Sequence, residues 1–107
     1  HRHVLLTRRY AIKVPRLNYG WKFFLRGLLA NINEAFIWRV LNNPKLCPVV
    51  FALRSGWLIV MRRALPLTEE QWKTTNYDRF YDIVQCENKI DSFGMLDGRI
   101  VVIDYGN

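Results

Sequence analysis

Hydrophobic and polar residues follow a clear pattern at the end of the sequence. Two apolar runs, Phe93–Leu96 and Ile100–Ile103, flank an Asp-Gly dipeptide at positions 97 and 98. Asp-Gly between hydrophobic segments is a strong signal for a two-residue turn. The pattern therefore predicts an antiparallel β-hairpin, and its second strand leads directly to the carboxylate of Asp104.

Two further pairs of apolar runs predict strands in the first two thirds of the chain. Val4–Thr7 and Tyr10–Val14 are separated by two arginines, and they predict either a tight hairpin or one bent strand. Pro48–Leu53 and Trp57–Met61 are joined by Arg-Ser-Gly, which predicts a second hairpin. Because this second pair is nearly all apolar, we expect both strands in the centre of a sheet, away from its edges.

A helical period separates the two pairs. From Lys22 to Val40, apolar residues recur at steps of three and four, which predicts an α-helix. The glycine-containing segment Leu17–Trp21 predicts a loop before it, and Asn42-Asn43-Pro44 predicts its end. The pattern leaves open whether Gly27 and Asn31 divide the helix in two.

The chain beyond the second hairpin predicts smaller elements. Ala64–Thr68 reads as an extended connector, and Thr68 with Gln71 resembles a capping box at the start of a short helix. Asn76–Val84 has a second helical pattern, and Gln85–Asp91 is a polar loop. The order predicts one α+β domain over residues 1–107, with a mostly antiparallel sheet, one main helix and one or two short helices.

The charge of the chain is concentrated in its first half. Half of the 107 residues are hydrophobic and 14% are aromatic, which predicts a folded chain. Residues 1–50 contain nine Lys or Arg and one acid, Glu34, a net charge of +8, whereas residues 51–107 carry a net charge of −1. This asymmetry predicts an anionic partner for the first half; a basic, solvated surface is the alternative.

Membrane insertion and disulfide formation are not expected. The longest apolar stretch, Pro48–Met61, is interrupted by Arg54 and is too short to span a bilayer. The basic start is not followed by the pattern of a signal peptide, so we expect a cytoplasmic protein. Cys47 and Cys86 lack neighbours at ligand spacing, and we expect two free thiols.

The order of elements and five of their residues resemble the protein-kinase-like family. Lys13, in Tyr-Ala-Ile-Lys, matches the strand lysine that in that family pairs with nucleotide phosphates and a helix glutamate. Glu34 lies where that glutamate would be, residues 62–67 would form the hinge, and Asp104-Tyr105-Gly106 resembles the D-F-G triplet whose Asp holds magnesium. The chain is similar to small kinase-like proteins of bacteriophages and prophages, in which D-Y-G replaces D-F-G.

This resemblance implies ATP and Mg²⁺ as cofactors, with Lys13 and Glu34 at the nucleotide. It also implies a catalytic loop at Gln85–Ser92, where Glu87 and Lys89 take the places of the family's Asp and Lys. Asp104 and Ser92 would hold the metal, Ser92 in place of the family's Asn.

The sequence also departs from the family pattern. No glycine-rich phosphate loop precedes Lys13, and Glu87 is one methylene longer than aspartate. Since phosphoryl transfer depends mainly on positioning, these differences weigh against efficient catalysis. The sequence contains no activation segment after the D-Y-G triplet, so we expect a chain that does not turn over substrate.

Each matching residue also has a simpler structural interpretation. Lys13 could be a solvated lysine at a sheet edge, because lysines are mostly exposed. Glu34 could form an ordinary surface pair with Arg39 or Lys13. Asp104 could cap a turn.

Three functions follow from these features. The first is a non-catalytic, kinase-like phage protein that binds and modulates or inhibits a host macromolecule, foremost a protein with an acidic surface, in the bacterial cytoplasm. Its predicted partner-binding residues are Arg16, Tyr19, Trp21, Lys22 and Arg26. The second is an ATP-dependent phosphotransferase that uses Lys13, Glu34 and Asp104. The third is a nucleic-acid-binding module that uses the basic half. A homodimer through a sheet edge is compatible with all three.

Overall fold

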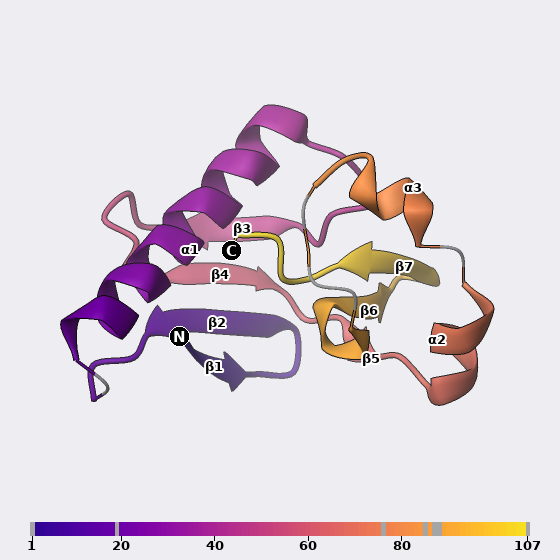
Figure 1. The fold of residues 1–107 in the computed structure, drawn as a ribbon, viewed down its shortest axis with the longest axis horizontal. Helices are drawn as coiled ribbons and strands as arrows, with labels where there is room; N and C mark the ends of the chain where they lie inside the picture. Colours follow the sequence, from indigo (N-terminus) through magenta and orange to yellow (C-terminus); the bar gives the residue numbers. More distant parts are fainter. Residues whose placement is uncertain (1, 19, 76, 85, 87–88, 107) are drawn as a thin grey trace.

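Two antiparallel sheets and one long helix make up the α+β fold (Figure 1). The computed structural model describes residues 2–18, 20–75, 77–84, 86 and 89–106. The larger sheet has the strand order β1-β2-β4-β3 and the smaller one the order β5-β6-β7. The strands are β1 (Arg2–Leu6), β2 (Tyr10–Pro15), β3 (Val49–Ala52), β4 (Ile59–Arg62), β5 (Leu65–Pro66), β6 (Phe93–Leu96) and β7 (Arg99–Val102). The helices are α1 (Trp21–Leu41), α2 (Glu69–Thr74), α3 (Asp78–Tyr81) and a 3₁₀ turn, η1 (Ile90–Ser92).

The first two strands form a hairpin, which decides between the two alternatives that the sequence left open. β1 pairs with β2 from Arg2 opposite Pro15 to Leu6 opposite Ala11. Because side chains alternate across a strand, this register puts Arg2 on the same face of the sheet as Lys13. β2 also pairs with β4, so Lys13 lies on an inner strand of the sheet.

The long helix is continuous. It begins at Trp21, one residue earlier than predicted, and ends at Leu41. The cap residue Asn42 has a left-handed backbone, and its N–H donates to the Trp38 carbonyl at 2.8 Å. Asn31 does not break it, because its side-chain amide donates to the carbonyls of Lys13 (3.1 Å) and Gly56 (2.8 Å). These bonds tie the middle of α1 to the sheet.

The hairpin of β3 and β4 is present, but one expectation about it is wrong. β4 lies inside the larger sheet, whereas β3 is its outermost strand. Val50 and Phe51 of β3 are about half exposed, at 52% and 51%. The apolar composition of β3 therefore does not reflect burial on both faces within this chain.

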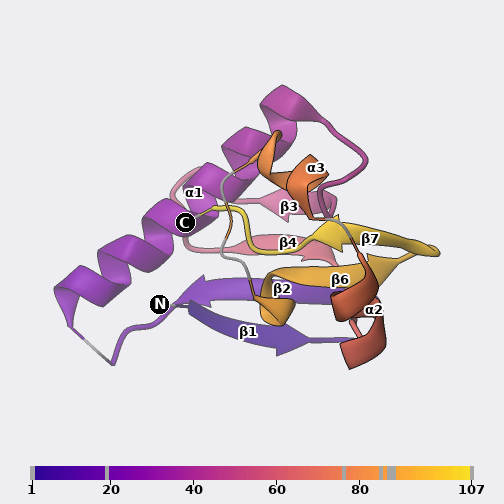
Figure 2. The same ribbon diagram turned by 45° about the vertical axis from the view of Figure 1, so that its right-hand side comes forward.

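The smaller sheet begins with a strand that the sequence did not predict. Leu65–Pro66, within the predicted connector, pairs with β6. The β6–β7 hairpin is present as predicted, and Asp97 (φ 51°) and Gly98 (φ 81°) both adopt the positive φ angles that its tight turn requires. Figures 1 and 2 show this sheet together with α2 and α3 at one end of the molecule.

The short helices only partly match the prediction. The capping box is confirmed, because the Thr68 N–H donates to Gln71 Oε1 (2.9 Å) and the Gln71 N–H donates to Thr68 Oγ1 (3.1 Å). α3 is much shorter than the predicted segment 76–84 and covers four residues. None of the helices in the described parts of the chain combines the length and apolar character needed to cross a bilayer.

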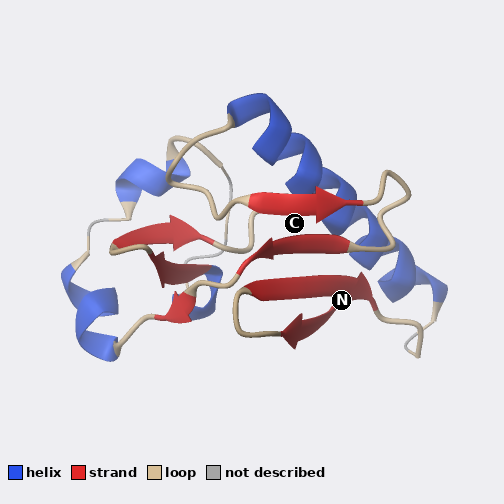
Figure 3. Ribbon diagram, turned by 180° about the vertical axis from the view of Figure 1, so that it is seen from behind, coloured by secondary structure: helices blue, strands red, loops and turns tan. Residues whose placement is uncertain are grey.

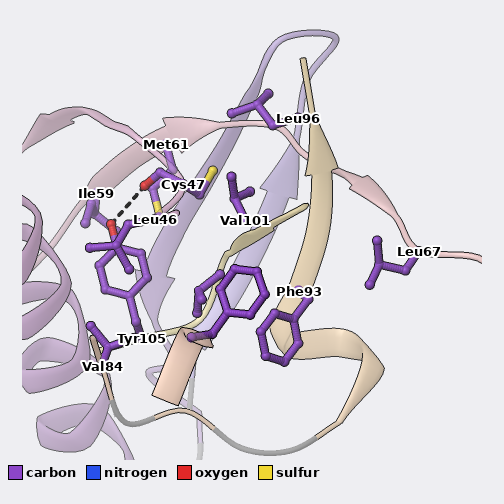
Figure 4. Packing of buried hydrophobic residues seen from close by; sticks show 12 residues of the cluster. Leu46, Cys47, Ile59, Met61, Leu67, Val84, Phe93, Leu96, Val101 and Tyr105 are labelled. Carbon is purple, nitrogen blue, oxygen red and sulfur yellow. Dashed lines mark hydrogen bonds between the residues drawn. The ribbon is translucent and has the colours of Figure 1, made fainter. Parts of the chain in front are cut away.

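The hydrophobic core joins the two sheets. Viewed from behind, α1 lies across the far face of the larger sheet (Figure 3). Tyr105 is 1% exposed, and its hydroxyl donates to the Cys47 carbonyl at 2.9 Å, beside Leu46 and Val84 (Figure 4). Cys47 and Cys86 are free thiols, as expected, and burial raises the pKa of Cys47 to about 11. The C-terminal segment is thus an integral part of the core.

Candidate functional site

A buried cluster of charged residues lies where α1 faces β2. Glu34 is on the inner face of the helix and has no exposed surface. The Lys13 ammonium donates to both of its carboxylate oxygens, at 3.0 and 3.3 Å. The interpretations of Lys13 as a solvated edge lysine and of Glu34 as part of a surface pair are therefore wrong, because both side chains are buried within the fold.

The Lys13 ammonium has a third acceptor. Its Nζ lies 2.7 Å from the carbonyl oxygen of Ile103, which directly precedes Asp104. An ammonium group has three N–H donors, and here the two Glu34 oxygens and this carbonyl provide acceptors for all of them. Lys13 thus joins β2, α1 and the C-terminal segment.

Arg2 is the residue of this cluster that the sequence analysis missed. Its Nη1 lies 2.7 Å from Glu34 Oε1, and its Nη2 lies 2.8 Å from Asp104 Oδ1. Nη1 also donates to Asn31 Oδ1 at 3.0 Å, and the Arg2 side chain is 8% exposed. The predicted strand began at Val4; extending its alternation back by two residues would have placed Arg2 beside Lys13.

The carboxylate of Glu34 also holds the Asp-Tyr-Gly segment. The backbone N–H groups of Tyr105 and Gly106 donate to Glu34 Oε2 at 3.1 and 3.2 Å. Gly106 lies so close to α1 that a Cβ there would collide with the Ala30 carbonyl and with Glu34 Cγ. The third residue of the triplet therefore has to be glycine in this arrangement.

The cluster contains two cations, Arg2 and Lys13, and two carboxylates, Glu34 and Asp104. Interactions among these groups shift the pKa values of Glu34, Asp104 and Arg2. Burial acts to raise the pKa of Glu34, but the charges and hydrogen bonds of Lys13 and Arg2 bring it below its usual value. Burial and the negative charge of Glu34 raise the pKa of Asp104, although Lys13 and Arg2 oppose them. Burial alone would lower the pKa of Arg2, but Glu34 and Asp104 raise it above its ordinary value.

A cavity of about 170 Å³ opens beside the cluster. It lies between the first hairpin, β4, the chain that follows β4, and the segment before Tyr105. Its apolar wall consists of Val4, Leu6, Ala11, Met61 and Ala64, and Arg2, Lys13, Asp91 and Asp104 are among its charged lining residues. This combination of an apolar wall and a charged end is typical of small-molecule sites.

The remaining predicted site residues are only partly brought together. Ser92 lies next to the Asp104 segment, because its carbonyl accepts from the Ile103 N–H at 2.9 Å. Its hydroxyl is buried and has no hydrogen-bond partner within the described part of the chain. Lys89 is exposed at the start of η1, and Glu87 lies outside the described residues. Among the described side chains, no group of three or more His, Cys, Asp or Glu residues gathers to hold a metal ion.

The predicted partner-binding residues divide into two groups. Trp21, Lys22 and Arg26 are exposed on the first turns of α1, and Trp21 is 76% exposed. Arg16 is half-buried, and its Nε donates to the Arg2 carbonyl at 3.2 Å, so it supports the strand that carries Arg2. Tyr19 lies outside the described residues.

Comparison of the chain with family models, with curated proteins and with solved structures found no match. The kinase-like ancestry therefore stays a prediction from the sequence. The arguments about function that follow depend on the geometry of the charged cluster, the cavity beside it and the exposed surface.

Proposed function

We propose that this protein is a non-catalytic, kinase-like phage protein, which acts by binding and modulating or inhibiting a host protein with an acidic surface. One observation carries the proposal: the charged groups expected to handle nucleotide phosphates and metal are already engaged with one another. Lys13 has its three acceptors within the chain, and Arg2 pairs with both Glu34 and Asp104.

Ligand phosphate and metal would have to displace these contacts. A phosphate that approached Lys13 would compete with a fully buried carboxylate, and a metal at Asp104 would compete with the guanidinium of Arg2. Separating one partner of a buried ion pair costs about 3–5 kcal/mol when the other stays buried. The cluster is therefore better suited to holding α1, the first hairpin and the C-terminal segment together than to cycling through substrates.

The exposed charge supports an acidic partner. Glu34 is the only acid among residues 1–50, and it is buried, so the exposed surface of this half carries cations alone. Lys22 and Arg26 are one helical turn apart on α1 and are both exposed. A surface with a single sign of charge attracts a partner of opposite sign and speeds its association.

Labelled ATP tests the catalytic half of the proposal. The purified protein is incubated with ATP and Mg²⁺, with and without a generic protein acceptor, beside an Asp104→Ala variant. We expect neither autophosphorylation nor transfer above the level of the variant. Transfer that disappears in Asp104→Ala would show the proposal to be wrong.

Affinity capture tests the binding half. Wild-type protein and a Lys22→Glu/Arg26→Glu variant are used to capture proteins from bacterial lysate in parallel, and we expect a protein with an acidic surface to be retained by the wild type alone. If the wild type and the variant retained the same protein equally, the basic start of α1 would not be part of the interface.

The cavity favours a second candidate, a nucleotide-dependent phosphotransferase. Its apolar wall could receive a base, with Lys13 and Asp104 at its charged end. Ser92, whose hydroxyl has no hydrogen-bond partner among the described residues, lies next to the same segment. This candidate predicts saturable ATP binding that Lys13→Met abolishes, measured by calorimetry. ATP binding without transfer would support a nucleotide-sensing role for the cavity within the first proposal.

A further inference from the structure

The outer face of α1 is apolar where a surface helix is ordinarily polar. The side of the helix that faces the sheet buries Phe24, Gly27, Ala30, Asn31 and Glu34. On the opposite side, a stripe of exposed apolar residues recurs at steps of three and four: Leu25, Leu29, Ile32, Phe36 and Val40. Leu29, Phe36 and Val40 are 57%, 53% and 60% exposed. A helix that is apolar on both sides is typical of one that is covered on both sides.

The stripe continues onto β3. This strand is the outermost of the larger sheet, and in the described part of the chain its outer edge has no partner strand. Figures 1 and 3 show it beside α1. Between the two elements lies a groove of about 630 Å³, lined by Ile32, Asn33, Ala35, Phe36, Arg39 and residues 49–54. Exposed apolar side chains on both elements, such as Phe36 on α1 and Phe51 on β3, mark an interaction site.

Among the described residues of α1 and of the groove lining, all exposed charges are positive. Lys22, Arg26 and Arg39 are the charged residues on the exposed sides of α1, and Arg54 lies at the end of the groove. The one acid of the helix, Glu34, faces inward and is fully buried. Among the described residues that line the groove there is no acid. A partner that covers the stripe thus has to bring negative charge at its borders.

We propose that the stripe and the groove bind an acidic amphipathic helix of a partner protein. This inference rests on the proposed function and identifies the surface and the chemistry of the partner. The stripe runs from Leu25 to Val40, about 22 Å along the helix axis, which suits a helix of about four turns. A second copy of the chain would place like charges against one another, which disfavours self-association through this face.

Designed peptides test the charge requirement. Fluorescein-labelled helical peptides of about 18 residues carry Leu and Phe along one side and Glu beside them; matched peptides carry Lys in place of Glu or the same residues in scrambled order. We expect fluorescence anisotropy to show that the Glu peptides bind at least about tenfold more tightly than either control. This preference should diminish as salt rises.

Variants locate the binding surface. Leu29→Gln/Phe36→Gln should weaken binding of the Glu peptides at least about tenfold, because it removes two apolar anchors from the stripe. Arg39→Glu should weaken the Glu peptides and strengthen the Lys peptides. Leu5→Gln is the matched control, since Leu5 is 58% exposed on β1, at the opposite edge of the sheet, and should leave binding unchanged. Circular dichroism verifies that each variant is folded.

Three results would overturn the inference. The first is equal binding of Glu and Lys peptides, or binding that is insensitive to Leu29→Gln/Phe36→Gln. The second is a dimer in light scattering that this double variant dissociates, which would assign the stripe to a second copy. The third is binding to phosphatidylglycerol-containing vesicles without binding to peptides, which would assign it to a membrane surface. Phosphate transfer from ATP would overturn the proposed function alone, because peptide binding to the outer face does not require the cavity.

Discussion

At the scale of single residues, Glu34 has the largest structural role. Its carboxylate accepts from Lys13, Arg2 and two backbone N–H groups of the C-terminal segment. Removing a carboxylate from water costs several kcal/mol, and only such a complete set of partners offsets that cost. A neutral or shorter side chain at this position leaves buried cations without their counter-charge.

Replacement of Glu34 tests this role. We expect Glu34→Gln to lower the free energy of unfolding by about 3–5 kcal/mol, because Arg2 and Lys13 stay buried with less negative charge nearby. Urea denaturation followed by circular dichroism measures the change. Glu70→Gln, on an exposed turn of α2, is the control and should unfold like the wild type. Equal stabilities of all three proteins would contradict the role assigned to Glu34.

The pH dependence of stability follows from the same carboxylates. The pKa of Glu34 lies below its usual 4.5 in the folded protein, so its contribution is full above that value and is lost as the pH falls through the lowered pKa. The pKa of Asp104 is raised above 3.8, so its shift has the opposite sign and adds stability as the pH falls through the raised pKa.

Denaturation at several pH values separates the two contributions. Between about pH 5 and about pH 3, the stability of Glu34→Gln should decline less steeply than that of the wild type, and the stability of Asp104→Asn should decline more steeply. Parallel declines in all three proteins would show that neither carboxylate governs the acid response.

At the scale of elements, α1 supports two different surfaces. Its inner side carries the charged cluster and receives the C-terminal segment, where Asn33 donates to the Gly106 carbonyl at 3.2 Å. Its outer side carries the apolar stripe from Leu25 to Val40. Because Leu29 and Phe36 belong to the exposed stripe and Glu34 to the buried cluster, substitutions in the stripe should affect binding, and substitutions in the cluster should affect folding.

The contact of the C-terminal segment with α1 leaves no space for a side chain. Gly106→Ala would place a methyl group against the Ala30 carbonyl, which belongs to the helix backbone and cannot move freely. We expect this variant to lose about 1–3 kcal/mol of stability, as overpacked sites do. Thermal unfolding measures the loss, and a wild-type midpoint would show that the segment can be accommodated away from the helix.

At the scale of the whole molecule, the charged cluster connects the two ends of the described chain. Arg2 begins the first strand, and Asp104 follows the last one; their ion pair of 2.8 Å joins them across the inner side of α1. The core and this ion pair therefore connect the smaller sheet with the larger one.

Hydrogen exchange tests this connection. Arg2→Met should speed exchange of the Tyr105 and Gly106 amides, because it removes one of the two cations that hold Glu34 in place as their acceptor. Arg8→Met, in the exposed turn of the first hairpin, should leave both rates unchanged. Equal rates in the two variants would show that Lys13 alone holds the carboxylate.

The sequence by itself determined the elements whose signals are local. The turn at residues 97–98, the capping box of Thr68 and Gln71, and the end of α1 before Asn42 all depend on residues within a few positions of one another, and all are present. The pairing of Lys13 with Glu34 was also foreseen, although through a resemblance and not through local chemistry.

Only the tertiary structure decided what depends on distant contacts. The edge position of β3, the strand at Leu65–Pro66 and the place of Arg2 between Glu34 and Asp104 all result from which strands pair across the sheets. An apolar run has the same pattern whether this chain or a partner covers it, because burial depends on what packs against the run. The sequence therefore determined the elements with local signals, and long-range packing decided the remaining strand pairings and which faces remained exposed.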